Sequence, residues 1–182
     1  ALKIAKRIGY PVLIRPSYVL GGQGMRIAVK EEELKGYVSR ILKTHPENAF
    51  LIDKYLEQAI EVDVDSVYDG DQLHISGMMQ HIEPAGVHSG DSTAVLPPYS
   101  LSEEVMQTIR DYQKKIAEGM EILGFLNVQY AVKNEKVFVL EANPRTTRTV
   151  PFLAKANQIP EAAIGTKVML GAKLKDFDLK SR

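Results

Sequence analysis

The stretch "FLNVQYAVKNEKVFVLEANP", residues 125–144, decides the fold. Two runs rich in apolar and β-branched residues flank the pair Asn134-Glu135, which predicts an antiparallel hairpin that turns at this pair. Folding about the turn places Gln129 opposite Leu140 or Glu141, depending on the length of the loop. Glu141 and Asn143 are two residues apart, so they point to the same face of their strand. The hairpin therefore brings three oxygen-bearing side chains together.

The side-chain oxygens of Gln129, Glu141 and Asn143 are hard ligands of the kind that magnesium prefers, especially where phosphate supplies further oxygens. The same spacing also fits a solvated polar face at the edge of a sheet. Arg145 and Arg148 follow the strand, and two guanidinium groups suit phosphoryl charge. A simple surface pair has the same spacing. From the residues alone, the hairpin is a candidate magnesium and phosphate site with a structural alternative.

The segments around the hairpin predict an antiparallel sheet backed by helices. "AIEVDVDSVYDG", residues 59–70, alternates apolar and acidic residues and ends in an Asp-Gly hairpin turn that leads into residues 72–82. Apolar residues at helical spacing predict a helix from Ser102 to Leu123, with a capping box at Ser100 and Glu103 and a stop at Gly124. A last helical stretch, residues 151–170, is interrupted near Pro160.

The first part of the chain predicts a smaller unit of alternating helices and strands. Helices are expected over residues 2–8 and 31–43, and strands over residues 12–15, 26–29 and 49–53. The fold class is therefore α+β, with two domains: a small α/β lobe over residues 1–56 and a large lobe, an antiparallel sheet backed by helices, over residues 57–182.

The loop "GGQGM", residues 21–25, offers backbone N–H groups that phosphate oxygens can approach closely. It lacks the lysine and the Ser/Thr of a P-loop, and it lacks the spacing of a dinucleotide fingerprint. A plain turn between strands is the alternative. Arg15 lies on the preceding strand, just before the loop, and favours an anion nearby.

The loop "HIEPAGVHSGDS", residues 81–92, has three interpretations. Ser89, His88 and Asp91 suggest a catalytic triad, but adjacent residues seldom reach that geometry and no G-x-S-x-G elbow is present. A zinc site at His81, Glu83 and His88 lacks a helical pair and a fourth ligand. In the third interpretation, Gly86 and Gly90 let the loop fold over a ligand to which His88 and Ser89 donate or accept hydrogen bonds. The chemistry slightly favours the third.

Composition excludes several classes of function. The 182 residues contain 23 Lys plus Arg and 23 Asp plus Glu, so no overall charge favours nucleic acid or an anionic membrane. There is no signal peptide, and no apolar run reaches the roughly 20 residues of a membrane span. The absence of cysteine excludes disulfides and thiol catalysis and is consistent with a cytoplasmic protein. The abrupt start and end of the chain predict a segment of a longer polypeptide.

Five motifs together resemble the large subunit of carbamoyl phosphate synthetase over nearly the whole chain: "IRPSYVLGG", "EVDVD", "HIEPAGVHSGDS", "NVQYAVK" and "LEANPRTTRTVPF". That subunit carries two ATP-grasp halves, and "RPSYVLGG", "GVHSGDS" and "RTVPF" resemble the second, carbamoyl-phosphate-forming half. The resemblance implies an ATP-grasp fold and ATP-dependent phosphorylation of carbamate. The alternatives are another ATP-grasp ligase, such as a carboxylate–amine ligase or a biotin-dependent carboxylase, and a nucleotide-binding fragment without activity.

The resemblance also implies roles for individual residues. Those of the nucleotide site are Arg15, Gly21 and Gly22 at the phosphates, Lys54 and Leu56 at the adenine, Glu61 at the ribose, and Gly86, Val87, His88 and Ser89 along its wall. Gln129, Glu141 and Asn143 match the ligands of Mg2+ or Mn2+, and the first two also contact the nucleotide. Arg145 and Arg148 match catalytic positions that face phosphate and carbamate. K+ is implied as a further ion.

The implied partners are a glutamine amidotransferase small subunit, which supplies ammonia, and the rest of the large subunit, whose first half makes carbamate. The chain on its own is then expected to be inactive. Two departures from the family pattern stand out: many members have Arg-Ala at Gln23-Gly24, and "NPRTTRT" replaces the more usual "NPRASRT". The first removes an arginine that would contact phosphate.

Overall fold

A computed structural model describes residues 1–16, 24–44 and 50–179. The chain forms two compact units, Ala1–Leu56 and Glu57–Arg182. Gly21 and Gly22, predicted to contact phosphate, lie outside the described residues. Among the described residues, no helix is long and apolar enough to cross a membrane.

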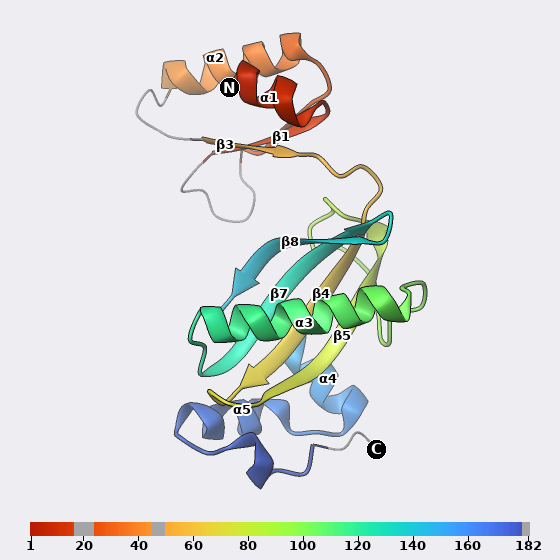
Figure 1. The fold of residues 1–182 in the computed structure, drawn as a ribbon, viewed down its shortest axis with the longest axis vertical. Helices are drawn as coiled ribbons and strands as arrows, with labels where there is room; N and C mark the ends of the chain where they lie inside the picture. The colour runs from red at the N-terminus through yellow and green to blue at the C-terminus, as the bar shows by residue number, and fades with distance from the viewer. Residues whose placement is uncertain (17–23, 45–49, 180–182) are drawn as a thin grey trace. The chain divides into compact units, whose positions relative to one another are not determined.

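Within its described residues, the first unit is a three-stranded antiparallel sheet with two helices on one face (Figure 1). Its elements are α1 (Leu2–Ile8), β1 (Val12–Pro16), β2 (Arg26–Ala28), α2 (Glu31–Thr44) and β3 (Phe50–Lys54), with strand order β2-β1-β3. The core is small, with Ala5, Val12, Ile14, Ala28 and Leu34 buried. The helices and strands predicted for this part of the chain are confirmed, because apolar periodicity and the Gly9 stop determine them locally.

The second unit is a five-stranded antiparallel sheet of order β6-β5-β4-β7-β8. Its strands are β4 (Ile60–Tyr68), β5 (Leu73–Pro84), β6 (Ala94–Val95), β7 (Gly124–Lys133) and β8 (Lys136–Asn143). Its helices are α3 (Glu103–Gly119), α4 (Val150–Asn157), α5 (Glu161–Met169) and the 3-10 turn η1 (Leu174–Asp176). The predicted α+β class, with an antiparallel sheet backed by helices, is confirmed.

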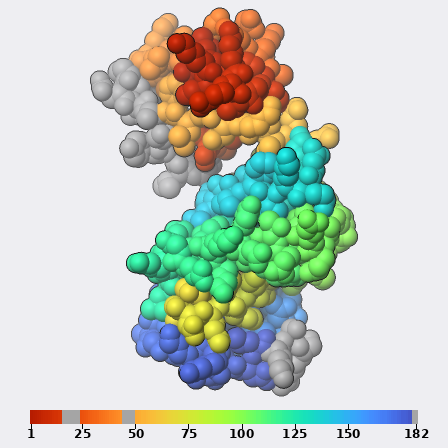
Figure 2. Space-filling view, in the orientation of Figure 1, coloured from red at the N-terminus to blue at the C-terminus, as the bar shows by residue number. Residues whose placement is uncertain are grey.

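The two faces of this sheet are covered differently. Helix α3 crosses one face over a core that includes Val64, Ile109 and Val128, and it lies at the front in the views of Figures 1 and 2. The opposite face carries α5 at one end, where Val67, Ile164 and Val168 form a separate core. On the same face α4 packs on β5, with Leu153 against Gly77. Rows of polar side chains on β4, β7 and β8 lie beside it and form the candidate site.

The β7–β8 hairpin turns at the predicted pair, since Asn134 and Glu135 have φ of 50° and 61°. Tyr130 pairs with Val139, but the next residue, Gln129, pairs with Glu141, so Leu140 is bulged out of the ladder. A bulge adds one residue to one strand. The register left open by the sequence is therefore resolved: Glu141 lies opposite Gln129.

The boundaries of α3 correct the sequence prediction. The N-cap is Ser102, whose Oγ accepts a hydrogen bond from the Val105 N–H at 3.3 Å, whereas the Ser100 hydroxyl accepts one from Gln80. The helix ends at Gly119, before the predicted end at Leu123, because Glu121 adopts φ of 52° and turns the chain. Leu123, expected on the apolar helix face, is 52% exposed. The predicted break near Pro160 is confirmed as the gap between α4 and α5.

Candidate functional site

Polar side chains form two rows across the face of the sheet opposite α3. Asp63 pairs with Gln129, which pairs with Glu141 on the next strand. Asp65 pairs with Asn127, which pairs with Asn143. Directly paired residues point to the same face. The three side chains of the predicted metal set therefore converge on adjacent positions of β7 and β8.

The chemistry of these three side chains fits a divalent cation. The Asn143 amide nitrogen donates to Asn127 Oδ1 at 3.4 Å, and the Gln129 amide nitrogen donates to Ser89 Oγ at 3.4 Å. Because both amide nitrogens are hydrogen-bonded, the two amide oxygens and the exposed Glu141 carboxylate are left as possible metal ligands. Oxygen ligands are the type that Mg2+ prefers. The metal role remains a prediction that this geometry is consistent with.

A buried acid–base pair lies beside the first row. His81 Nε2 lies 3.0 Å from Asp63 Oδ2, and its Nδ1 is buried 3.8 Å from Glu61 Oε1 without a hydrogen-bond partner among the described residues. The hydrogen bond to Asp63 raises the pKa of His81, although burial opposes the shift. Burial raises the pKa of Glu61, although the charge of His81 opposes this. The cluster therefore favours a positively charged imidazole between two acids.

Asp65 is held by neutral hydrogen-bond donors. Its Oδ1 accepts from the Thr147 hydroxyl at 2.7 Å and from the Asn127 amide at 3.2 Å, and its Oδ2 accepts a short hydrogen bond from the Thr149 hydroxyl. Burial raises the pKa of this carboxyl group, and the hydrogen bonds oppose the shift. The carboxylate thus ties the segment after β8 to the centre of the sheet.

The loop of residues 85–92 carries Ser89 to this face. Arg148 Nη2 donates to Ser89 Oγ at 3.0 Å, so Ser89 accepts from both Arg148 and the Gln129 amide. A Cβ on Gly90 would lie 2.9 Å from Arg148 Nη1, closer than real Cβ contacts allow. Glycine at this position therefore leaves room for the guanidinium.

Two interpretations of this loop are wrong. His88 Nδ1 accepts from the Gly90 N–H at 3.0 Å, and Ser89 is bonded to Arg148, so the structure shows no Ser-His-Asp relay. Glu83 accepts from the Thr93 N–H at 2.6 Å and His81 is paired with Asp63, so the zinc set is directed elsewhere. Among the described residues, no group of three or more His, Cys, Asp and Glu side chains is arranged to hold a metal ion.

A cavity of about 240 Å³ opens beside these residues. Asp63, His81, Ser89, Gly90, Arg148 and Thr149 are among the residues that line it. Of the two predicted catalytic arginines, only Arg148 lines this cavity, whereas Arg145 Nη1 donates to the carbonyl of its neighbour Thr146 at 3.2 Å. The structure therefore brings Arg148 to the polar face and directs Arg145 to its own loop.

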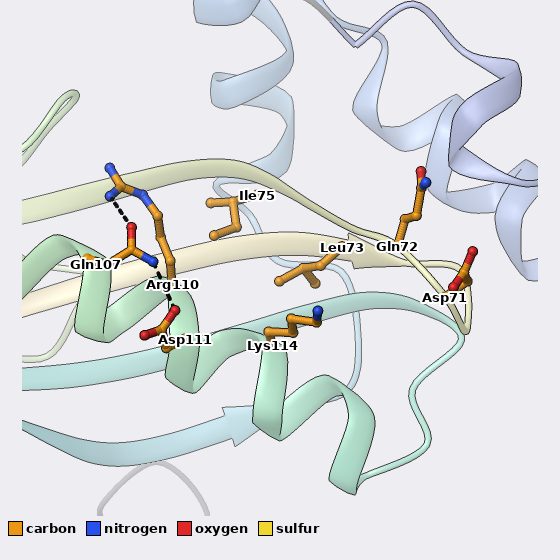
Figure 3. Close-up of a pocket in the computed structure, with 8 residues that line it drawn as sticks. All are labelled: Asp71, Gln72, Leu73, Ile75, Gln107, Arg110, Asp111 and Lys114. Carbon is orange, nitrogen blue, oxygen red and sulfur yellow. Dashed lines mark hydrogen bonds between the residues drawn. The ribbon is translucent and has the colours of Figure 1, made fainter.

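A larger cavity of about 480 Å³ lies elsewhere on the unit, between α3 and the β4–β5 turn (Figure 3). Its wall on α3 is tied together by hydrogen bonds from Arg110 to Gln107 and from Gln107 to Asp111, as the dashed lines in Figure 3 show. None of the residues predicted for the site lines it. Cavity size alone would therefore not select the predicted site.

In the first unit, Arg15 Nε donates to Asp53 Oδ2 at 2.7 Å, so the predicted phosphate contact is paired with a carboxylate. Lys54 Nζ donates to the carbonyls of Gly9 at 3.1 Å and Tyr10 at 2.7 Å. These bonds occupy the side chain of Lys54, whose predicted role involved only the backbone of this segment. Leu56, predicted beside it, ends the unit and is half-buried.

The sequence-based prediction of the site missed a group of polar residues beside the predicted ligands. Its members are Asp63, Asp65, Asn127, Thr147 and Thr149, of which the first three are buried. A signal was present, because polar residues alternate in both "EVDVD" and "NVQ". The polar residues lie side by side because β4 pairs with β7. The alternation within each strand does not predict which strands pair.

Solved structures show the same fold at low sequence identity. A biotin carboxylase complex with β,γ-ATP from Campylobacter jejuni matches with a TM-score of 0.76 at 20% identity, over 96% of this chain and 40% of that one. The N5-carboxyaminoimidazole ribonucleotide synthetase from Thermus thermophilus matches with a TM-score of 0.77 at 16% identity, over 99% of this chain and 46% of that one. The fold is ATP-grasp, as predicted.

Sequence relatives define the family. The family model described as the ATP binding domain of the carbamoyl-phosphate synthase L chain matches residues 1–177, and the chain belongs to this family. The carbamoyl phosphate synthase large chain of Archaeoglobus fulgidus is 54% identical over the whole chain, which spans 17% of that relative. The C-terminal section of the large chain from Methanocaldococcus jannaschii is 55% identical over 99% of the chain, which spans 30% of that relative.

Proposed function

We propose that this chain binds ATP and transfers its γ-phosphoryl group to carbamate, forming carbamoyl phosphate and ADP. The observation that carries the proposal is the convergence of Gln129, Glu141 and Asn143 on one sheet face, with Arg148 held nearby through Ser89. The family membership and the relatives named large chain, C-terminal section, support it. The chain spans 17% of the length of the Archaeoglobus fulgidus relative, so the activity is proposed for a complete protein of that kind.

The reaction needs positioning and charge stabilisation rather than acid–base chemistry. A carbamate oxygen forms a bond to the γ-phosphorus, the bond from that phosphorus to the bridging oxygen breaks, and ADP leaves with the electron pair. No proton moves, so no general base is required. Arg148 would stabilise the negative charge on the transferred group. Mg2+ bound by Gln129, Glu141 and Asn143 would neutralise the phosphate oxygens.

Further assignments rest on the resemblance. Arg15, Gly21 and Gly22 are proposed at the phosphates, Lys54 and Leu56 at the adenine, and Glu61 at the ribose. Arg145 is proposed to face the substrate when it is bound. Mn2+ as a substitute metal, K+ as a further ion, ammonia from a glutamine amidotransferase subunit and a cytoplasmic location belong to the same set of predictions.

The substitution Glu141→Gln tests the metal site. In the complete protein it should lower carbamoyl phosphate formation from carbamate and Mg-ATP by about 100-fold or more, because the only charged member of the ligand set is lost. The matched control is Glu121→Gln, at an exposed position after α3, which should leave the rate unchanged. A near-normal rate for Glu141→Gln at saturating magnesium would contradict the assignment.

The biotin-carboxylase alternative is not favoured, because the relatives above 50% identity are named carbamoyl phosphate synthase, whereas the biotin carboxylase structure shares 20% identity. Measuring ADP release with carbamate or biotin as the acceptor separates the two activities. The non-catalytic alternative is tested by calorimetric titration with Mg-ATP, since heat of binding without turnover in the complete protein would support it.

A further inference from the structure

Asp65 has an unusual environment for a carboxylate. It lies in the middle of β4, is 2% exposed, and has neighbouring strands on both sides. A buried charge is costly unless it is paired or fully hydrogen-bonded. The hydrogen bonds recorded for its two oxygens within the described ranges come from Thr147, Thr149 and Asn127, all neutral. Through these hydrogen bonds, Asp65 connects β4 to β7 and to the segment that follows β8.

The hydrogen bond from Thr149 to Asp65 replaces the helix-cap hydrogen bond that a threonine at this position usually makes. Thr149 occupies the N-cap position of α4, where threonine normally accepts a hydrogen bond from the backbone of the first turn. Its side chain makes no cap hydrogen bond and donates to Asp65. The Thr147 and Thr149 hydroxyl oxygens lie 2.6 Å apart, so one carboxylate holds both. The sequence places a helix-capping residue here, and the fold uses it for a contact with the sheet.

The residue between the two threonines is Arg148. While its neighbours are bonded to Asp65, Arg148 reaches Ser89, which also accepts from the Gln129 amide. The backbone on both sides of Arg148 is therefore fixed to the sheet, and the guanidinium is fixed at its far end. Asn127 extends the contact, because it donates to Asp65 and accepts from Asn143.

We propose that Asp65, through the hydroxyls of Thr147 and Thr149, is the positioning residue that sets Arg148 in place at the polar face. The effect on catalysis rests on the proposed function. The placement of Arg148 can be tested without an activity assay. Asp65 does not touch the substrate in this scheme and acts only through the segment that carries the arginine.

The first test measures the placement itself. Thr149→Val removes the hydroxyl while keeping the shape, and Thr149→Ser keeps the hydroxyl. In the complete protein, the rate of Arg148 modification by phenylglyoxal, followed by peptide mass spectrometry, should rise several-fold in the valine variant and stay at the wild-type rate in the serine variant. Arg110 on α3 serves as the internal reference, and Thr166→Val, on the exposed side of α5, is the matched control. Unchanged labelling of Arg148 would overturn the proposal.

The second test links placement to turnover. Thr149→Val should lower kcat for phosphoryl transfer by about 10- to 100-fold, the size typical of groups that orient a ligand or reacting group, with the KM for ATP changed less than about threefold. In an Arg148→Met background, Thr149→Val should cause no further loss of kcat, because its effect on turnover depends on Arg148. Additive losses in that double-mutant cycle would overturn the positioning role. If Arg148→Met alone left turnover intact while Thr149→Val still raised labelling, the catalytic role of Arg148 would fail and its placement by Asp65 would stand. If the wild-type complete protein formed no carbamoyl phosphate while the labelling changed as expected, the proposed function would fail and the placement would still stand.

Discussion

At the scale of single residues, Asp69 connects the β4–β5 turn to the end of the chain. It is 2% exposed, and its carboxylate accepts from the backbone N–H groups of Asp71 at 2.9 Å, Gln72 at 2.7 Å and Leu174 at 2.7 Å. Burial alone would raise the pKa of Asp69, but these backbone hydrogen bonds outweigh it and lower the pKa. One carboxylate thus stabilises a turn and anchors a distant segment.

The substitution Asp69→Asn should reduce the free energy of unfolding at neutral pH by about 1.5–3 kcal/mol, the value of hydrogen bonds to a charged group. Because the folded pKa is lowered, the stabilisation is present above the unfolded pKa of about 3.9 and is lost as the pH falls through the folded value. Urea unfolding of both proteins at a series of pH values measures the difference. It should shrink below about pH 4, and a constant difference would contradict the assignment. Asp71→Asn, with an exposed side chain, is the control.

Other single residues show what the sequence could predict. The acidic residues of "EVDVD" lie opposite the apolar ones, as the alternation predicted. Their burial did not follow from that pattern, because it depends on the loops of residues 85–92 and 144–149, which fold back over the sheet. The role of Thr149 was hidden for the same reason, since a threonine before a helix ordinarily indicates a cap.

At the scale of elements, α5 packs on β7 through a glycine. A Cβ on Gly165 would lie 2.1 Å from the ring of Phe125, so the helix approaches the strand as closely as its backbone permits. Helix propensity alone favours alanine over glycine by about 1 kcal/mol. Packing opposes this preference here, because the ring of Phe125 occupies the space that an added Cβ would need.

Gly165→Ala should therefore destabilise the second unit by about 1–3 kcal/mol, the usual cost of overpacking. Thermal unfolding measures it, and Phe125→Leu in the same protein should recover part of the loss by freeing space. Gly119→Ala is the matched control, because Gly119 ends α3 with nothing near its added Cβ and should be neutral or stabilising. Equal effects of the two alanine substitutions would show that the contact with Phe125 does not limit the packing.

Some features of the helices and strands could be predicted from adjacent residues, and others depend on distant parts of the chain. The hairpin turn, the Gly9 stop and the break before α5 were predictable because each depends on a few adjacent residues. The end of α3 was not, since the apolar spacing continues through Met120 and Leu123 after the backbone has left the helix. The register opposite Gln129 was ambiguous by one residue, and only the bulge at Leu140 resolves it.

At the scale of the whole molecule, the two units have separate cores. Among the residues that the structure describes, the first unit has one small cluster around Ile14 and Leu34, and the second has two clusters, one under α3 and one beside α5. Short chains bury a smaller share of their surface and are correspondingly less stable. The second unit is therefore expected to fold independently, and the first to be marginal alone.

Residues 57–182 expressed alone should unfold in a single cooperative transition and retain the near-ultraviolet circular dichroism of the buried Tyr68 and Tyr130. Residues 1–56 are the comparison and should show a weaker, broader transition. Loss of the tyrosine signal with retained far-ultraviolet signal in the larger piece would indicate a molten state, and would mean that its core needs the first unit.

The bulge at Leu140 also determines which changes of length the hairpin tolerates. Without Leu140, Val139 and Glu141 would be consecutive, and the ladder would run unbroken while Glu141 still faced Gln129. Removing a residue elsewhere in β8, between the turn and Glu141, would uncouple that pairing unless the bulge closed to absorb the loss. Loss of one residue at the bulge is therefore the length change that leaves Glu141 and Asn143 on the polar face.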